Sequence, residues 1–120
     1  MYWGQVPVFS GDKDLTLKEE QMQFIIFAYD GKDENALARR MKVREQHLEN
    51  MAKLNEEGHV ICAGGMTGED GKLMGSFLVM EFDSEEELDQ YLKTEPYMTG
   101  DVWKDITIED CNVVFGGSGK

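Results

Sequence analysis

The chain has 120 residues, enough for one domain with a single hydrophobic core but not for two. It carries 24 acidic and 12 basic residues, a formal net charge of -12, so its surface should repel nucleic acids and anionic membranes. Residues 1–11 lack the positive charge and apolar run of a signal peptide, and no later apolar run approaches a membrane span. These features predict a soluble, cytoplasmic protein.

A strand is predicted first, over residues 23–29, because a short aromatic and β-branched run there ends at Asp30-Gly31. A long amphipathic helix is predicted over residues 35–57. Gly58 follows it as a stop signal, and apolar residues recur along it at steps of three and four: Leu37, Met41, Leu48, Met51 and Ala52.

Two further strands are predicted over residues 60–63 and 75–82, the first closed by Gly64-Gly65. The polar stretch between them, with its Glu69-Asp70-Gly71 sequence, is typical of a hairpin with a long loop.

Ser84, followed three residues later by Glu87, is a capping-box pattern that begins a second helix, and Pro96 prevents its continuation. Ile106 and Ile108 then alternate with polar residues in a fourth strand, which we expect to continue to residues 113–115.

The predicted order is βαββαβ, an α+β fold of the ferredoxin-like type. We assign residues 22–115 to this domain, residues 1–21 to an N-terminal extension and residues 116–120 to a flexible tail rich in glycine and serine.

Both faces of the predicted sheet are apolar, although two helices cover only one face. In the first strand Phe24 and Ile26 point to one side, and Ile25 and Phe27 point to the other. An apolar face left in water favours sheet-to-sheet packing of two copies, so we expect a homodimer. The alternative is that residues 1–21 fold over this face.

The two cysteines, Cys62 and Cys111, are far apart in sequence and predict reduced, buried thiols rather than a disulfide. His59 and Cys62 are too few ligands for a zinc site. We expect no metal and no cofactor.

On a helical wheel at about 100° per residue, Arg44 falls in the middle of the apolar stripe of the long helix, and His47 lies at its shoulder. Both side chains should therefore point toward the sheet. An unpaired buried guanidinium would be costly, so a carboxylate or a bound anion should meet Arg44. A structural ion pair and a satisfied core histidine are the alternatives to a functional site.

Glu95 is the acid of a Glu95-Pro96-Tyr97 sequence, and Pro96 restricts it to an extended conformation just after a helix. It should project a carboxylate from a rigid corner. An ordinary solvated glutamate before a turn is the alternative.

Several motifs together, in order and spacing, resemble the YCII-related family over roughly residues 22–112. They are Val43 to Leu48 with its R-x-x-H-L pattern, Gly58, Ala63-Gly64-Gly65, Gly75-Ser76 and Glu95-Pro96-Tyr97. The resemblance implies a dimeric α/β barrel, with His47 and Glu95 as the active-site pair. Glu95 stands where aspartate is usual in the family.

The resemblance implies a YCII-like small-molecule enzyme of the lyase, isomerase or dehalogenase-like kind. His47 would be the general base supported by Glu95, acting on a small anionic or aromatic molecule. We expect four residues to contact the substrate: Arg44, Tyr97, Ser76 and Asp30. The alternative is a non-catalytic module that binds a small ligand or a partner protein.

Overall fold

The structure is a computed structural model of the chain that describes residues 21–116. Seven elements follow one another: β1 (Met22–Asp30), α2 (Ala36–Glu56), β2 (Val60–Thr67), β3 (Leu73–Phe82), α3 (Glu85–Thr94), α4 (Pro96–Thr99) and β4 (Trp103–Cys111). Apart from residue 21, the predicted extension lies outside the described residues, as do residues 117–120 of the predicted tail.

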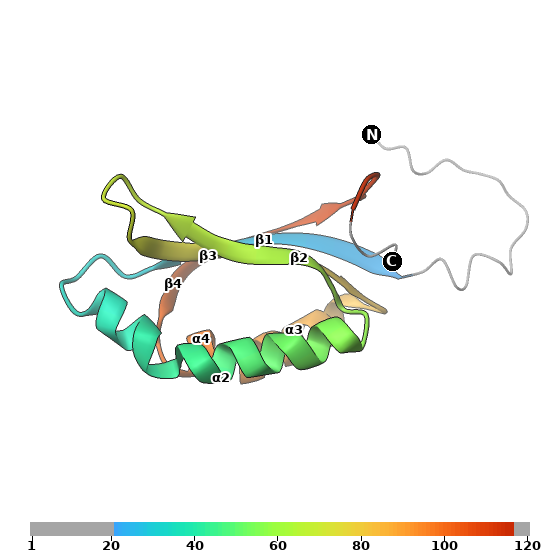
Figure 1. Cartoon of the computed structure of the whole chain (residues 1–120). Coiled ribbons are helices and arrows are strands. Elements are labelled where there is room, and N and C mark those ends of the chain that lie inside the picture. Colours follow the sequence, from blue (N-terminus) through green and yellow to red (C-terminus); the bar gives the residue numbers. More distant parts are fainter. Residues whose placement is uncertain (1–20, 117–120) are drawn as a thin grey trace, which may run out of the picture.

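The four strands form one antiparallel sheet in the order β2-β3-β1-β4. The βαββαβ order and this strand order are those of a ferredoxin-like fold, which confirms the predicted class. The helices lie together on one face of the sheet (Figure 1). Among the described residues, no helix is long and apolar enough to cross a membrane.

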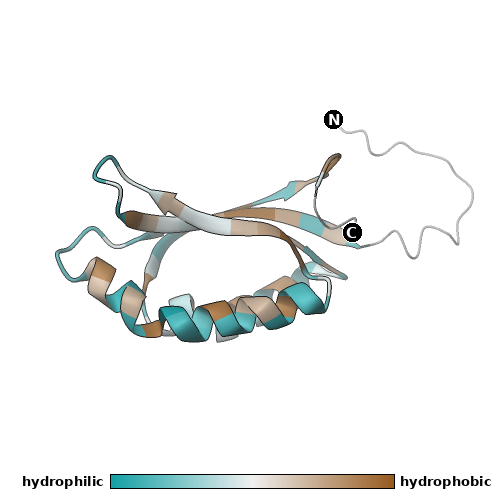
Figure 2. Ribbon diagram, in the orientation of Figure 1, coloured by the Kyte–Doolittle hydropathy of each residue, from teal (hydrophilic) through white to brown (hydrophobic). Residues whose placement is uncertain are grey.

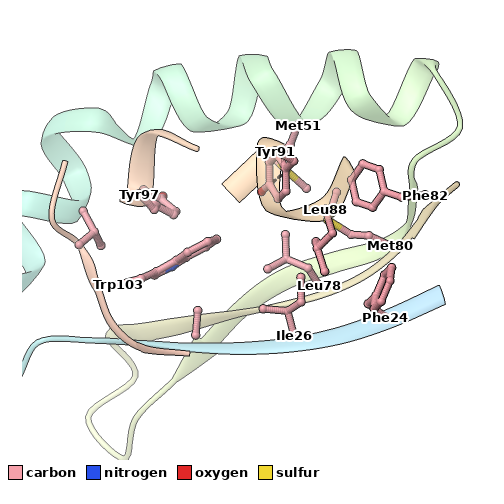
Figure 3. Packing of buried hydrophobic residues seen from close by; sticks show 12 residues of the cluster. Phe24, Ile26, Met51, Leu78, Met80, Phe82, Leu88, Tyr91, Tyr97 and Trp103 are labelled. Atoms are coloured by element: carbon pink, nitrogen blue, oxygen red, sulfur yellow. Dashed lines mark hydrogen bonds between the residues drawn. The ribbon is translucent and has the colours of Figure 1, made fainter. Parts of the chain in front are cut away.

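The core lies between the sheet and the helices, and β1 and β3 contribute alternate apolar residues to it (Figure 3). Figure 2 gives the hydropathy of each residue along the strands and helices that enclose it. Phe24 and Ile26 from β1, with Leu78 and Met80 from β3, are almost fully buried on this face. The opposite face carries the other set of alternate residues, which are half-buried: Ile25, Phe27, Tyr29, Phe77 and Val79. The predicted two-sided apolar pattern is therefore present.

Strand β2 does not end at Gly64, contrary to the prediction, but continues through both glycines to Thr67. The glycines make room for neighbouring side chains. A Cβ atom at Gly64 would lie 2.8 Å from the ring of Phe77, and one at Gly65 would lie 2.5 Å from Leu73. These glycines therefore permit close packing within the strand and do not mark a turn.

The predicted start of α3 at Ser84 is confirmed, although Glu87 reaches the N–H of Asp83 and not, as a capping box would require, that of Ser84. The Ser84 hydroxyl accepts the N–H of Glu87 at 3.2 Å, and the Glu87 carboxylate accepts the N–H of Asp83 at 3.1 Å. By contrast, β4 ends at Cys111 and does not continue as predicted. The N–H of Val113 instead donates to the side chain of Gln23, so the ladder stops there.

The prediction of which face of α2 is buried is wrong. The observed buried face is rotated about the helix axis relative to the predicted apolar stripe. Met41 and Leu48 are 53% and 46% exposed, whereas the buried residues of the helix are Ala36, Arg40, His47 and Met51. Two polar side chains occupy the inward face because each of them pairs with a buried partner there. A wheel based on apolar residues alone could not detect this arrangement.

The cysteines are both free in the structure, as predicted, but Cys62 is exposed and not buried. It lies on β2, an edge strand of the sheet that residues 21–116 form. Cys111 is half-buried, and desolvation raises the pKa of its thiol.

Candidate functional site

His47 and Glu95 meet in the buried space between α2 and the junction of α3 and α4. His47 is 8% exposed and Glu95 is completely buried. Nδ1 of His47 lies 2.5 Å from Oε2 of Glu95. Pro96 holds Glu95 in an extended conformation, with φ -64 and ψ 126, so its side chain turns back from the corner toward α2.

The Glu95 carboxylate has further hydrogen-bond donors. The backbone N–H of Tyr97 donates to Oε2 at 3.0 Å, which caps the short helix α4. The hydroxyl of Tyr91, one helical turn before Glu95, donates to Oε1. With donors on both oxygens, the carboxylate is an oriented acceptor for the imidazole.

The imidazole ring is held in place by aromatic neighbours. The ring of Tyr97 stacks on it with centroids 3.9 Å apart and an interplanar angle of 16°, and Trp103 meets its edge at 6.2 Å. Figure 3 shows Tyr97 and Trp103 near each other. Because Nδ1 faces Glu95, the carboxylate selects the tautomer that carries its proton on Nδ1. Nε2 is then the nitrogen available to a bound molecule.

Arg40 forms a second buried polar cluster next to the first. Its guanidinium is 2.9 Å from Asp30 and donates to the Ser76 hydroxyl at 2.5 Å and to the backbone oxygen of Gly75 at 2.8 Å. It also lies 4.5 Å above the Tyr97 ring and 3.4 Å from its hydroxyl. Arg40 therefore fixes the aromatic ring that stacks on His47.

Burial changes the acid–base behaviour of two members of this cluster. Desolvation raises the pKa of Asp30, and the charge of Arg40 opposes the rise. Desolvation also raises the pKa of the Tyr97 phenol, opposed by Arg40 and Arg44. Tyr97 therefore keeps its proton at neutral pH.

A pocket of about 540 Å³ opens between α2 and β2. Three basic side chains line it: Arg40, Arg44 and His47. Most of its other walls are apolar, and they include Leu48, Met51, Val60, Ile61, Ala63, Leu73, Phe77 and Leu78. Such a site suits a small ligand with an apolar or aromatic body and an acidic group.

The predicted site residues are distributed as follows. His47, Arg44, Tyr97 and Ser76 line the pocket. Glu95 lies directly behind His47. Asp30 is buried against Arg40 and is not part of the pocket wall.

A buried carboxylate, Asp30, meets Arg40 and not Arg44, so the ion-pair alternative for Arg44 is wrong; a bound anion at Arg44 stays a prediction. Arg44 is half-buried at the pocket and forms no ion pair with another described residue. Sequence reasoning missed Arg40, although it lies seven residues before His47 and so on the same helix face. It also missed Tyr91, which precedes Glu95 by four residues.

Within residues 21–116, no group of three or more histidine, cysteine or acidic side chains is arranged to hold a metal ion.

Comparison with known proteins decides the family. Residues 22–112 match the sequence profile of the YCII-related domain. The chain belongs to the YCII-related domain family. Protein YciI of Escherichia coli O6:H1 is 29% identical over 100 residues, covering 78% of this chain and 100% of that protein. An uncharacterized protein of Haemophilus influenzae is 28% identical over 100 residues, with the same coverage of 78% and 100%.

A solved structure has the same fold as this YCII-related chain. It is the 5-chloro-2-hydroxyhydroquinone dehydrochlorinase of Burkholderia phenoliruptrix, in complex with 2,5-dihydroxybenzoquinone. The TM-score is 0.67 at 23% identity, and the match covers 76% of this chain and 94% of that one.

Proposed function

We propose that this YCII-related chain is a small-molecule enzyme in which His47 is the general base. The observation that supports this proposal is the contact of Nδ1 with the buried carboxylate of Glu95, at the wall of a pocket. Glu95 directs the imidazole and stabilises the charge that His47 acquires when Nε2 takes a proton. Because Glu95 is completely buried, its role is to position His47 and not to touch the substrate.

The proposed reaction is an elimination or an isomerisation. In an elimination, Nε2 of His47 removes a proton from a phenolic hydroxyl or an acidic carbon. The electron pair of the broken bond moves into the ring or chain, and a leaving group such as chloride departs with its own bonding pair. In an isomerisation, His47 returns the proton to another carbon. Neither route requires a redox cofactor.

Arg44 is proposed to bind the acidic group of the substrate. It lies one helical turn from His47, lines the same pocket and forms no ion pair elsewhere among residues 21–116. Tyr97 and Ser76 form part of the same wall, next to Arg40. Asp30 contributes indirectly, through its ion pair with Arg40.

The dehydrochlorinase with the same fold suggests a substrate class for the test. That protein is a dehydrochlorinase of 5-chloro-2-hydroxyhydroquinone in complex with 2,5-dihydroxybenzoquinone, and both compounds are small, planar and acidic. A molecule of this size and charge suits a pocket with apolar walls and the guanidinium of Arg44. We therefore propose a hydroxylated, acidic aromatic compound as the substrate class.

The proposed assembly is a homodimer packed through the helix-free face of the sheet, which would complete a dimeric α/β barrel. That face presents Ile25 and Phe27 from β1 beside Phe77 and Val79 from β3. A contiguous apolar surface of this kind is usually covered in water-soluble proteins.

The experiment has a binding part and a turnover part. Calorimetry with 2,5-dihydroxybenzoquinone tests the pocket in the wild type, in Arg44→Gln and in Lys42→Gln, a matched control that removes an exposed charge of the same helix. We expect Arg44→Gln to weaken binding about 10- to 100-fold and Lys42→Gln to have little effect. Equal affinity of all three proteins would contradict the role of Arg44.

Turnover is measured by chloride release from chlorinated hydroxyhydroquinones. His47→Ala should abolish any release observed in the wild type while leaving the fold intact. Binding without release in the wild type would instead favour the alternative, a non-catalytic ligand-binding module. Full activity of His47→Ala would remove His47 from the mechanism.

A further inference from the structure

Tyr91 contacts Glu95 from the side away from His47 and lies outside the pocket. It lies on α3, four residues before Glu95, and its hydroxyl donates to Oε1 of that carboxylate. The side chain is 7% exposed and packs in the core beside Phe82 and Met51 (Figure 3). It does not line the pocket that contains His47.

The direction of this hydrogen bond follows from the surroundings of the phenol. Burial and the negative charge of Glu95 raise the pKa of Tyr91, so the hydroxyl keeps its proton. The other atom within reach is the sulfur of Met51 at 3.6 Å, which is a weak acceptor. Tyr91 is therefore a donor to Oε1.

The two oxygens of Glu95 consequently have separate tasks. Oε2 serves the imidazole of His47 and the N–H of Tyr97, and Oε1 is engaged by Tyr91. Without the phenol, Oε1 would be a buried oxygen whose partner had been removed, and the carboxylate would rotate to share its remaining donors.

We propose that Tyr91 is a positioning residue of the site, whose hydroxyl holds the Glu95 carboxylate so that Oε2 stays directed at Nδ1 of His47. Its bearing on catalysis rests on the proposed function. Its effect on the imidazole does not, because that effect is measurable without a substrate.

The test is NMR of the imidazole nitrogens and of the N–H protons in full-length protein. Tyr91→Phe should weaken or broaden the downfield Nδ1–H signal of His47, because the carboxylate is no longer held toward the ring. His59, whose Nδ1 faces the backbone oxygen of Glu81, is an internal control that should not move. Leu88→Ala, which loosens the packing of the same helix, should lower the melting temperature and leave the His47 signals unchanged.

A second variant does not depend on the stability of Tyr91→Phe. Site-specific 3-fluorotyrosine at position 91 is a stronger donor of nearly the same shape, so it should keep the Nδ1–H signal of His47 at least as sharp and as far downfield as in the wild type. In a Glu95→Gln background, neither change at position 91 should alter the His47 signals further. An unchanged His47 signal in Tyr91→Phe, a weakened one in the 3-fluorotyrosine variant, or changes that persist in Glu95→Gln would overturn the proposal and leave the proposed base role of His47 untouched.

Discussion

Nδ1 of His47 and Oε2 of Glu95 lie 2.5 Å apart although 48 positions separate them in the sequence. No single element of secondary structure brings the two residues together. Helix α2 directs the imidazole toward the sheet, and the extended conformation before Pro96 turns the carboxylate back toward α2. The pair is thus a product of tertiary packing, and changes on either side should separate its members.

Glu95→Asp should break the arrangement. Shortening the side chain withdraws the carboxylate by about 1.5 Å, the length of one C–C bond. The new side chain can still cap Tyr97, but it should lose Tyr91 and move away from His47. We expect a loss of about 1 to 3 kcal/mol in the free energy of unfolding, measured by urea denaturation.

The matched control is Glu95→Gln, which keeps the length and removes the charge. It should retain more of the packing but lose the downfield signal of the His47 Nδ1–H. Glu95→Asp with wild-type stability and an unchanged imidazole signal would show that the length of the side chain is immaterial.

The sequence predicts the fold well because the fold depends on local patterns. Alternation in β1 and β3, the N-cap at Ser84 and the stop at Gly58 each act within a few residues. The end of β2 was mispredicted because glycine can lie within a strand as well as mark its end. At Gly64 the missing side chain makes room for Phe77, a partner from another strand.

Only part of the site was predicted. The motif resemblance named His47 and Glu95 without geometry. The helical wheel chose Arg44 as the buried arginine because it used apolar residues to fix the phase of α2. Asp30 instead provides a buried partner for Arg40, so the helix turns a polar face inward. Which arginine of the helix is buried therefore depends on a residue from another element. Periodicity alone cannot reveal this.

Arg40→Met should be strongly destabilising, because it leaves the Asp30 carboxylate buried without its counter-charge. We expect a loss of about 3 to 5 kcal/mol in the free energy of unfolding, measured by denaturant titration. Replacing both partners, as Asp30→Leu with Arg40→Met, should recover part of that loss.

Arg39→Met is the neighbouring control. Arg39 pairs with Asp33 at the surface, with 27% of its side chain exposed, and its loss should matter far less. Equal effects of the two substitutions would contradict a structural role for the buried pair.

Phe27→Asp should convert the proposed homodimer to a monomer. Phe27 lies on the helix-free face of the sheet next to Phe77 in the paired strand, and a carboxylate there would be buried without a partner at the interface. Analytical ultracentrifugation measures the mass. Met41→Asp, on the exposed side of α2, is the control and should not change it. A monomeric wild type would exclude this assembly.

The acid side of the stability curve should depend on Asp33. The guanidinium of Arg39 donates two hydrogen bonds to this carboxylate, at 2.8 and 3.0 Å, and holds its pKa well below its usual range. A carboxyl group whose pKa is lower in the folded state stabilises the fold above its unfolded pKa of about 4, and that contribution disappears as the pH falls through the folded value. Asp33→Asn should therefore lower the urea midpoint at neutral pH, and the difference from wild type should shrink as the solution is acidified.

The control for Asp33→Asn is Asp89→Asn, an exposed position on α3 that forms no ion pair with another described residue. Its stability should follow the wild type at every pH. The predicted effect is small because Asp33 lies at the surface, and added salt should reduce it further. A difference between Asp33→Asn and wild type that stays constant from neutral to acidic pH would mean that the substitution acts through local structure, for example the Asp33 contact to the N–H of Asn35, and not through the charge of the carboxylate.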